Sequence, residues 1–340
     1  MSGTQYRGFT TPSLDPALLS DAATKWHANI VRYIMRPQFQ AEHGCHCTNM
    51  EAWQKMLAAL PAELDTAKQL HMAVVLAMFE APVEHYPEDG GDHAANAAFW
   101  SDNQSLEVMT QAWAQVAKIC ADRDQVIWFD LKNEPTDFNG PGSPRNWPSW
   151  AQSLIDSIRQ IDQQHQIVIE PGNGGSAMGF KFLPKMKGEG LIYSFHQYLP
   201  YDYTMQGNKG QKDPGQAQAY LQQRLTWPGT YSTGSWDKRR VEQQLQPAID
   251  FQNRYGVRMY VGEFSVVRWA PNATQWLRDN IDIFEKHGWD WTYHGFREHP
   301  MWSLEYSDDY QNPKNLQNTG QQSDRGQVLL DYLSRNAGQQ

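Results

Sequence analysis

The sequence predicts an α/β fold, a (β/α)8 TIM barrel formed by a single domain of residues 1–340, with long loops after its third and sixth strands. Short runs rich in β-branched and aromatic residues alternate with amphipathic helical runs, which is typical of parallel α/β architecture. Several strand candidates, such as VVLAMF and VIWFDL, are continuous apolar stretches, as expected for strands covered on both faces. An open doubly wound sheet is the alternative, but the glycine-rich first turn of a dinucleotide-binding fold is missing.

Eight strands are predicted in order along the chain. They are Tyr6–Phe9, Asn29–Ile34, Ala73–Phe79, Val126–Leu131, Gln166–Glu170, Leu191–Phe195, Val257–Val261 and Trp289–Tyr293. Apolar residues at helical spacing fill the gaps between these strands. The predicted helices are Met50–Leu70, Leu106–Cys120, Trp150–Ile161, Val241–Tyr255, Ala273–Lys286 and Gln327–Leu333. An earlier helix begins near Asp15-Pro16, because proline is favoured at the first helical position.

Two connections, Pro82–Asp102 and Leu199–Trp236, are too long to be simple links. Both follow strands, on the face where barrel active sites form, and long loops inside a compact domain are usually functional. The chain has 14 Trp and 15 Tyr, which is more than a core needs, because a buried ring requires a partner for its polar end. We expect six tryptophans in or beside the segments after strands to line a cleft: Trp147, Trp150, Trp227, Trp236, Trp269 and Trp302. The alternative is core packing, which we expect for Trp113 and Trp128.

Charge and composition argue against several classes of partner. The formal net charge is −9 and lysine and arginine form no cluster, so we expect neither nucleic acid nor an anionic membrane surface as a partner. No apolar run approaches the roughly 20 residues that a membrane helix needs. The start Met1-Ser2-Gly3 carries no export signal. The protein is therefore expected to be either secreted or periplasmic, with a leader absent from this sequence, or cytoplasmic.

The three cysteines are Cys45, Cys47 and Cys120, and an odd number with one Cys-x-Cys pair does not predict a disulfide framework. The stretch His43–Cys47 has the composition of a small metal cluster. However, no second Cys/His group lies at zinc-site spacing, and HExxH is absent. We therefore expect an ordinary βα loop with buried thiols and neither metal nor cofactor. Structural zinc is the alternative.

The strongest functional signal is Asn133-Glu134-Pro135, which follows the apolar strand Val126–Leu131. In a barrel, this placement puts a carboxamide and a carboxylate side by side at the catalytic mouth. A second glutamate, Glu263, closes the seventh strand. Because strands four and seven lie across the cavity of an eight-stranded ring, the two carboxylates are expected to face each other over a bound substrate.

At these motifs the chain resembles glycoside hydrolase family 5, the large group of cellulase- and mannanase-type barrels. The resemblance runs from Lys25–Arg32 to Trp291–His294 and includes Asn133–Pro135, Ser194–Tyr198 and Gly262–Phe264. It therefore covers nearly the whole chain. It implies a (β/α)8 barrel that hydrolyses β-glycosidic bonds with retention of anomeric configuration.

The resemblance implies that Glu134 is the general acid/base and Glu263 the nucleophile. Retaining glycosidases hold these two carboxyl groups about 5–5.5 Å apart. An ionised Glu263 would disfavour a second negative charge nearby, so Glu134 would stay protonated in the free enzyme. Asn133 would hydrogen-bond the sugar 2-hydroxyl.

Three further residues would support the carboxylates. Arg32 would keep the nucleophile ionised, Tyr198 would donate a hydrogen bond to it, and His196 would help set the protonation of Glu134. A purely structural role is the alternative for His196, and pairing with a different barrel carboxylate is the alternative for Arg32.

The resemblance assigns the residues that contact the sugar less precisely than the catalytic residues. The family usually presents an aromatic platform near the end of strand eight, and Trp302 is the candidate here, with His294 as a second site residue. After strand three the family often carries a histidine that contacts the sugar, whereas this chain has Phe79. His85, in the following loop, is the candidate substitute. This departure leaves the catalytic residues in place but bears on substrate specificity.

The expected protein is therefore a monomeric retaining glycosidase that acts on a β-linked polysaccharide or oligosaccharide, most simply an endo-β-1,4-glucanase (cellulase). The alternatives within the family are a β-mannanase, a β-1,3-glucanase and an exo-acting β-glycosidase on oligosaccharides or glycolipids. The long segment Leu199–Trp236 would favour exo action if it closed one end of the cleft. Two alternatives come from other classes: a non-catalytic carbohydrate-binding barrel, and a metal-dependent hydrolase that uses His43–Cys47.

Overall fold

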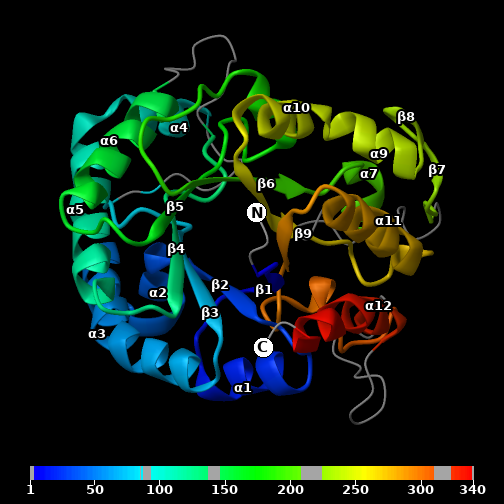
Figure 1. Cartoon of the computed structure of the whole chain (residues 1–340), viewed down its shortest axis with the longest axis horizontal. Helices are drawn as coiled ribbons and strands as arrows, with labels where there is room; N and C mark the ends of the chain where they lie inside the picture. The colour runs from blue at the N-terminus through cyan, green and yellow to red at the C-terminus, as the bar shows by residue number, and fades with distance from the viewer. Residues whose placement is uncertain are drawn as a thin grey trace.

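A closed barrel of eight parallel strands forms the centre of the computed structural model, which describes residues 4–84, 86, 93–136, 146–207, 224–309 and 323–338 (Figure 1). The strands are β1 (Arg7–Thr11), β2 (Ile30–Met35), β3 (Ala73–Met78), β4 (Val126–Asp130), β5 (Gln166–Ile169), β6 (Leu191–Gln197), β9 (Arg258–Phe264) and β10 (Asp290–Tyr293). They follow one another around the barrel in the order β1-β10-β9-β6-β5-β4-β3-β2. This arrangement confirms the predicted (β/α)8 fold.

Four strands, β1, β2, β6 and β9, extend beyond their predicted ends, and the extensions of β6 and β9 reach the site. β6 continues to Gln197 and β9 continues to Phe264, because His196 pairs with Glu263 and Gln197 pairs with Phe264 in the parallel ladder. The extension matters for the site, since it places a histidine and a glutamate on rigid strands and not in loops.

A packed core fills the barrel below its carboxyl-terminal mouth. Six side chains, one from each of six strands, are completely buried there: Ile30, Val75, Trp128, Val168, Ile192 and Tyr260. A larger apolar layer lies between the strands and the surrounding helices. Trp113 and Trp128 are both fully buried, as the sequence predicts. The interior is therefore a solid floor beneath the polar side chains at the mouth.

The helices surround the barrel (Figure 1). They are α1 (Pro16–Thr24), α2 (Pro37–Gln40), α3 (Asn49–Gln69), α4 (His93–Ser101), α5 (Asn103–Cys120), α6 (Trp147–Arg159), α7 (Tyr201–Thr204), α9 (Lys238–Gln244), α10 (Gln246–Tyr255), α11 (Ala273–Lys286) and α12 (Asp324–Leu333). Short π- or 3-10 turns are η1 (Ala41–Cys45), η2 (Ala177–Lys181), η3 (Pro300–Trp302) and η4 (Ser334–Gly338). The single predicted helix Val241–Tyr255 is wrong: α9 ends at Gln244 and α10 begins at Gln246, with Leu245 between them. Pro247 explains the break, because it lacks the N–H that would continue the helix.

The two long connections contain secondary structure of their own. The connection after β3 includes α4, and the connection after β6 includes α7 and the antiparallel hairpin of β7 (Gly229–Tyr231) and β8 (Gly234–Trp236). Such additions to a barrel must bury apolar side chains of their own to be stable.

This requirement accounts for a wrong prediction. Four tryptophans that we expected to line a cleft are buried: Trp147, Trp150, Trp227 and Trp236. Trp147 donates its indole N–H to the backbone oxygen of Glu170, and Trp227 donates to the carboxylate of Asp279. These rings pack the loops onto the barrel. Trp269 is half-buried, and Trp302 lies beside the site described below.

Cys45 and Cys47 are joined by a disulfide bond, so the expectation of two buried thiols is wrong. Their Cα atoms lie 5.3 Å apart, because the chain turns back at the end of η1, where His46 has a φ of 50°. The two sulfurs are therefore bonded to each other and are not thiolate ligands for zinc. Cys120 on α5 is a buried free thiol. Among the described residues, no helix is long and apolar enough to cross a membrane.

Candidate active site

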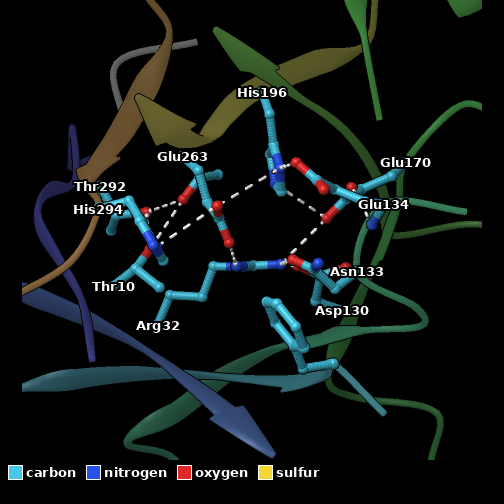
Figure 2. A network of polar contacts seen from close by, with 12 residues as sticks. Thr10, Arg32, Asp130, Asn133, Glu134, Glu170, His196, Glu263, Thr292 and His294 are labelled. Atoms are coloured by element: carbon cyan, nitrogen blue, oxygen red, sulfur yellow. Dashed lines mark hydrogen bonds and ion pairs between the residues drawn. The ribbon is translucent and has the colours of Figure 1, made fainter. Parts of the chain in front are cut away.

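Polar side chains from six of the eight barrel strands converge at the carboxyl-terminal mouth, and Figure 2 shows how they face one another. They are Arg32 on β2, Asp130 at the end of β4, Asn133 and Glu134 just beyond it, Glu170 directly after β5, His196 on β6, Glu263 on β9 and His294 directly after β10. In (β/α)8 barrels, the active site is built at this face. The residues singled out in the sequence thus come together, along with Asp130 and Glu170.

The guanidinium of Arg32 is the centre of this group. It is completely buried and donates to four acceptors: Oδ2 of Asp130 at 2.8 Å, Oε1 of Glu263 at 2.7 Å, Oδ1 of Asn133 at 2.9 Å and Oε1 of Glu170 at 3.0 Å. A planar guanidinium with five N–H donors suits such an array. Arg32 therefore binds Glu263, as predicted, and two further carboxylates as well.

Glu263 is buried but remains ionised. Burial raises its pKa, yet the positive charges of His294, His196 and then Arg32 outweigh this effect. A hydrogen bond from Tyr198 lowers the pKa further, and the result is about 2. Glu263 is consequently a carboxylate across the pH range in which most enzymes work.

Tyr198 directly follows β6 and donates its phenol hydrogen to Oε2 of Glu263 over 2.7 Å. Burial, and then the negative charge of Glu263, raise the pKa of this phenol well above its usual range. Tyr198 therefore stays a neutral donor. Together with Arg32, which binds Oε1, it fixes the orientation of the Glu263 carboxylate.

Glu134 has an unusual backbone conformation and a partly exposed side chain. Its φ is 43°, in the left-handed region that non-glycine residues rarely adopt. Its backbone N–H donates to Oε2 of Glu170 at 2.9 Å, and its Oε1 contacts Nδ1 of His196 at 2.7 Å. The side chain is 29% exposed, whereas that of Glu263 is 4% exposed. Of the two carboxylates, Glu134 is therefore the one more accessible from solvent.

His196 lies between several carboxylates. Nδ1 faces Glu134, and Nε2 lies 3.2 Å from Oε1 of Glu170. Burial lowers the pKa of this imidazole, but the charges of Glu170 and Glu263 and the close contacts with Glu134 and Glu170 raise it well above its usual value. The ring packs over Gly262, where an added Cβ would lie only 3.0 Å from Nε2, so glycine is needed there. A cationic His196 can donate from both ring nitrogens.

The two glutamates that the sequence singled out are close together. One carboxylate oxygen from each and a ring nitrogen of His196 all lie within 4.8 Å of one another. The pair Glu134 and Glu263 therefore has the short separation of retaining glycosidases and not the 6.5–9.5 Å that lets an inverting enzyme fit a water between its carboxyl groups.

Sequence reasoning missed the participation of Asp130 and Glu170. Asp130 ends and Glu170 directly follows a continuous apolar strand, the same kind of position as that of Glu263, and this was the available signal. Burial raises the pKa of Glu170, but His196 and Arg32 bring it below its usual value, so Glu170 is ionised. Burial raises the pKa of Asp130 to about 7, against the effect of Arg32 and with that of Glu170. Two neighbouring carboxyl groups thus have shifted pKa values of opposite direction.

The remaining predicted site residues lie on the β10 side. Nδ1 of His294 is 3.4 Å from Oε2 of Glu263. The ring of Trp302 lies 6.2 Å from that of Tyr198 and 6.2 Å from that of His294, and it is only 7% exposed. Its role as a sugar platform stays a prediction.

Phe79, where the resemblance leads one to expect a histidine, contacts Arg36: the guanidinium carbon of Arg36 lies 4.8 Å from the ring centre. Arg36 in turn pairs with Glu80 and Glu298. His85, the candidate substitute, lies outside the described residues.

The chain also matches a known family and several known proteins. Residues 3–299 match the family described as cellulase, glycosyl hydrolase family 5. Endoglucanase C of Acetivibrio thermocellus is 25% identical over 250 residues, which cover 68% of this chain and 70% of that protein. Cellodextrinase A of Ruminococcus flavefaciens is 24% identical over 196 residues, which cover 56% of this chain and 54% of the relative.

Solved structures show the same fold. Endoglucanase Cel5A from Thermotoga maritima superimposes with a TM-score of 0.69 at 19% identity, over 96% of each chain. A crystal structure described as a glycoside hydrolase has a TM-score of 0.73 at 19% identity, over 98% of this chain and 99% of the other. Because the family match covers most of the sequence, this chain belongs to glycosyl hydrolase family 5, the cellulase family, and is a glycoside hydrolase.

Proposed function

We propose that this enzyme is an endo-β-1,4-glucanase in which Glu263 is the nucleophile and Glu134 the general acid/base. The observation that carries the assignment is the difference in burial and hydrogen bonding between the two carboxylates. One oxygen of Glu134 and one of Glu263 lie within 4.8 Å of each other. Glu263 is buried, doubly hydrogen-bonded and ionised, with a pKa of about 2. Glu134 is more exposed and is held at one oxygen by His196.

In the first step, a carboxylate oxygen of Glu263 attacks the anomeric carbon while the bond from that carbon to the leaving oxygen breaks. Glu134 transfers its proton to the leaving oxygen, and a covalent glycosyl-enzyme forms. Esterification removes the charge of Glu263. In the second step, ionised Glu134 takes a proton from water, whose oxygen attacks the anomeric carbon and releases Glu263 as a carboxylate.

The neighbouring residues support these steps. Arg32 and Tyr198 each bind one oxygen of Glu263, which orients the nucleophile and keeps it charged. Asn133 accepts from Arg32 through Oδ1, and its Nδ2 has no hydrogen-bond partner among the described residues. A free amide donor beside the reacting carboxylates suits the 2-hydroxyl of the sugar, whose hydrogen bond strengthens in the transition state.

The substrate assignment is supported by the relatives, three of which are named endoglucanase C or C307 and match over 250 residues. A β-mannan is the second candidate, because one similar structure, of Thermotoga maritima Cel5A, is described in complex with mannotriose. Short cellodextrins are a third, since another relative is named cellodextrinase.

A substrate panel with product sizing tests the specificity. We expect barley β-glucan and carboxymethylcellulose to lose viscosity early, as internal cleavage requires. Release of a single short product with no early fall in viscosity would indicate exo action. Faster cleavage of mannan than of glucan would replace the glucanase assignment by the mannanase one.

Azide rescue tests the two catalytic roles separately. Glu134→Ala and Glu263→Ala should each lower turnover of a polysaccharide by at least about 10²–10⁴-fold. With an activated aryl glycoside, azide should restore turnover of Glu134→Ala and give a β-glycosyl azide, because the covalent intermediate still forms. With Glu263→Ala, azide should replace the nucleophile and give the α-glycosyl azide. The opposite pairing of products would exchange the two roles.

We further propose that the enzyme works in an oxidising compartment, as a secreted or periplasmic protein. The Cys45–Cys47 disulfide supports this proposal, because disulfides rarely persist in a reducing cytoplasm. Fractionation of the native host with an antibody against the chain would test it, and enzyme confined to the cytoplasm would reject it.

A further inference from the structure

Glu170 is a third glutamate at the mouth, beside the proposed acid/base (Figure 2). It directly follows β5 and is completely buried. Its carboxylate makes three contacts: Oε1 accepts from Nη2 of Arg32 at 3.0 Å and lies 3.2 Å from Nε2 of His196, and Oε2 accepts from the backbone N–H of Glu134 at 2.9 Å. Burying a charge is costly unless it is fully paired, so this position calls for an explanation.

We propose that Glu170 is a positioning residue for acid/base catalysis: it holds the backbone of Glu134 at one oxygen and, at the other, the His196 ring that contacts the Glu134 carboxylate. The proposal rests on the assignment of Glu134 as the general acid/base. Glu170 itself touches neither the substrate nor the reacting atoms. It acts through Glu134 and His196.

The backbone contact has a clear geometric purpose. Glu134 has a φ of 43°, and such a conformation persists only where the surroundings enforce it. The hydrogen bond from its N–H to Glu170 supplies one such constraint. Gly175 leaves the room for it: a Cβ there would lie 2.5 Å from Oε2 of Glu170 and 3.6 Å from the Cα of Glu134. This turn sets the direction in which the Glu134 side chain leaves the backbone.

The second contact sets the orientation of His196. Nε2 forms an ion pair with Oε1 of Glu170 over 3.2 Å, without hydrogen-bond geometry, while Nδ1 contacts Oε1 of Glu134 at 2.7 Å. A histidine held at one ring nitrogen presents the other in a defined direction. Glu263 is the only other carboxylate near this ring nitrogen among the described residues, with its Oε2 3.7 Å from Nδ1. Glu170 is thus the neighbour that faces Nε2, and the one that leaves Nδ1 available for the acid/base.

A carboxylate suits this position better than an amide does. All three neighbours of Glu170 are donors: the guanidinium of Arg32, the protonated ring of His196 and the backbone N–H of Glu134. A carboxylate accepts at both oxygens. A glutamine would accept at one side only, and its NH2 group would face a donor at the other.

A simpler role is that Glu170 only neutralises Arg32. Asp130 provides the matched control, because it too accepts from Arg32, at 2.8 Å, but among the described residues it forms no hydrogen bond or ion pair with Glu134 or His196. If Glu170 acted only through Arg32, then Glu170→Gln and Asp130→Asn would have the same kinetic signature. If it positions the acid/base, the signatures differ.

The test compares two substrates with the same glycone. A cello-oligosaccharide needs its leaving oxygen to be protonated, whereas a 2,4-dinitrophenyl cellobioside has a leaving group that departs without a proton. We expect Glu170→Gln to lower kcat/KM for the oligosaccharide by about 10- to 100-fold, because small misplacements of catalytic groups have effects of this size. The same variant should lower kcat/KM for the aryl glycoside far less. Asp130→Asn should lower kcat/KM for both substrates by one common factor.

The pH profile gives a second readout. The charged groups that face Glu170 are Arg32 from β2, His196 from β6 and Asp130 from β4. Loss of the Glu170 charge alters the electrostatic field at Glu134 through His196. We expect the alkaline limb of kcat/KM for the oligosaccharide to move in Glu170→Gln. Equal losses on both substrates with an unmoved alkaline limb would overturn the proposal.

Glu170→Asp covers the case in which the glutamine variant does not fold. It keeps the charge for Arg32 but withdraws both oxygens by one methylene, so it should show the same dependence on leaving group. Wild-type activity of Glu170→Asp on the oligosaccharide would also reject the proposal. Glu134→Ala separates the two levels of inference: if it retains oligosaccharide hydrolysis, the acid/base assignment itself fails, whereas a failure confined to Glu170 leaves that assignment in place.

Discussion

The phenol oxygen of Tyr198 lies 2.7 Å from Oε2 of Glu263, and the phenol donates the hydrogen bond. Arg32 binds the other oxygen at 2.7 Å, so both oxygens of the carboxylate are held and the carboxylate does not rotate freely. The same contacts that orient Glu263 also stabilise its charge. Orientation and ionisation of the proposed nucleophile are therefore linked, and variants at its neighbours should change both.

Tyr198→Phe should narrow the active pH range from the acid side. The lost hydrogen bond is one of the interactions that keep the pKa of Glu263 at about 2, so its removal raises that pKa. Because the nucleophile must be ionised, activity should then be lost at a higher pH as the solution is acidified. We also expect kcat to fall about tenfold or more, since a hydrogen bond to a charged group contributes roughly 1.5–3 kcal/mol. A kcat/KM profile with an unmoved acid limb would contradict this prediction.

His294→Gln should move the acid limb further than Tyr198→Phe does. His294 is the neighbouring charge that lowers the pKa of Glu263 most, and glutamine removes that charge while keeping a polar side chain. His287→Gln is the matched control, because His287 also pairs with a glutamate, Glu242, but forms no hydrogen bond or ion pair with the site among the described residues. The control should keep the wild-type profile, and a larger acid-limb shift in the tyrosine variant than in the His294 variant would refute the ranking.

Arg32→Lys should destabilise the fold as well as the active enzyme. Lysine keeps the charge but lacks the planar fork, so at least one of the buried carboxylates of Asp130 and Glu170 loses its partner. Loss of a buried ion-pair partner costs about 3–5 kcal/mol. Urea unfolding should show this fall in the free energy of unfolding. Arg278→Lys, in the exposed pair with Asp331, should change it by less than about 1 kcal/mol, and equal effects of the two substitutions would reject the argument.

Thiol titration should distinguish the three cysteines. Cys45 and Cys47 are bonded to each other, and burial raises the pKa of Cys120 to about 12, so its thiol is protonated and shielded. The unreduced native protein should therefore not react with Ellman's reagent. Unfolding without reductant should expose the thiol of Cys120 alone, and reduction should expose all three. Reaction of Cys45 and Cys47 before reduction would mean that the disulfide is absent.

Activity should also survive a chelator, as the absence of thiolate ligands at His43–Cys47 leads us to expect.

Much of the fold could be predicted from sequence because its signals are local. Continuous apolar runs such as Val126–Leu131 mark strands covered on both faces, and apolar spacing marks the helices around them. The ends of β6 and β9 were not visible in this way. Their last residues include polar side chains, and only the pairing of His196 with Glu263 across two strands extends the ladder.

The four buried tryptophans of the loops show the limit of composition. Trp147 and Trp227 occur in segments that follow strands, as cleft residues do, but what covers a ring depends on the partners that the folded loops bring to it. Nothing in the sequence near Trp227 indicates that its N–H will meet Asp279, which is 52 residues away.

The sequence by itself determined which residues stand at the carboxyl ends of the strands, including Glu134 beside Asn133, and Glu263 three strands later. It did so because the apolar run of each strand, and the order of the residues that follow it, are properties of the chain alone. Only the tertiary structure decided that Arg32 binds three carboxylates and that Glu170 meets both His196 and the backbone of Glu134. Those contacts join five strands that are far apart in sequence. They arise only when the barrel closes and its register brings the strand ends together.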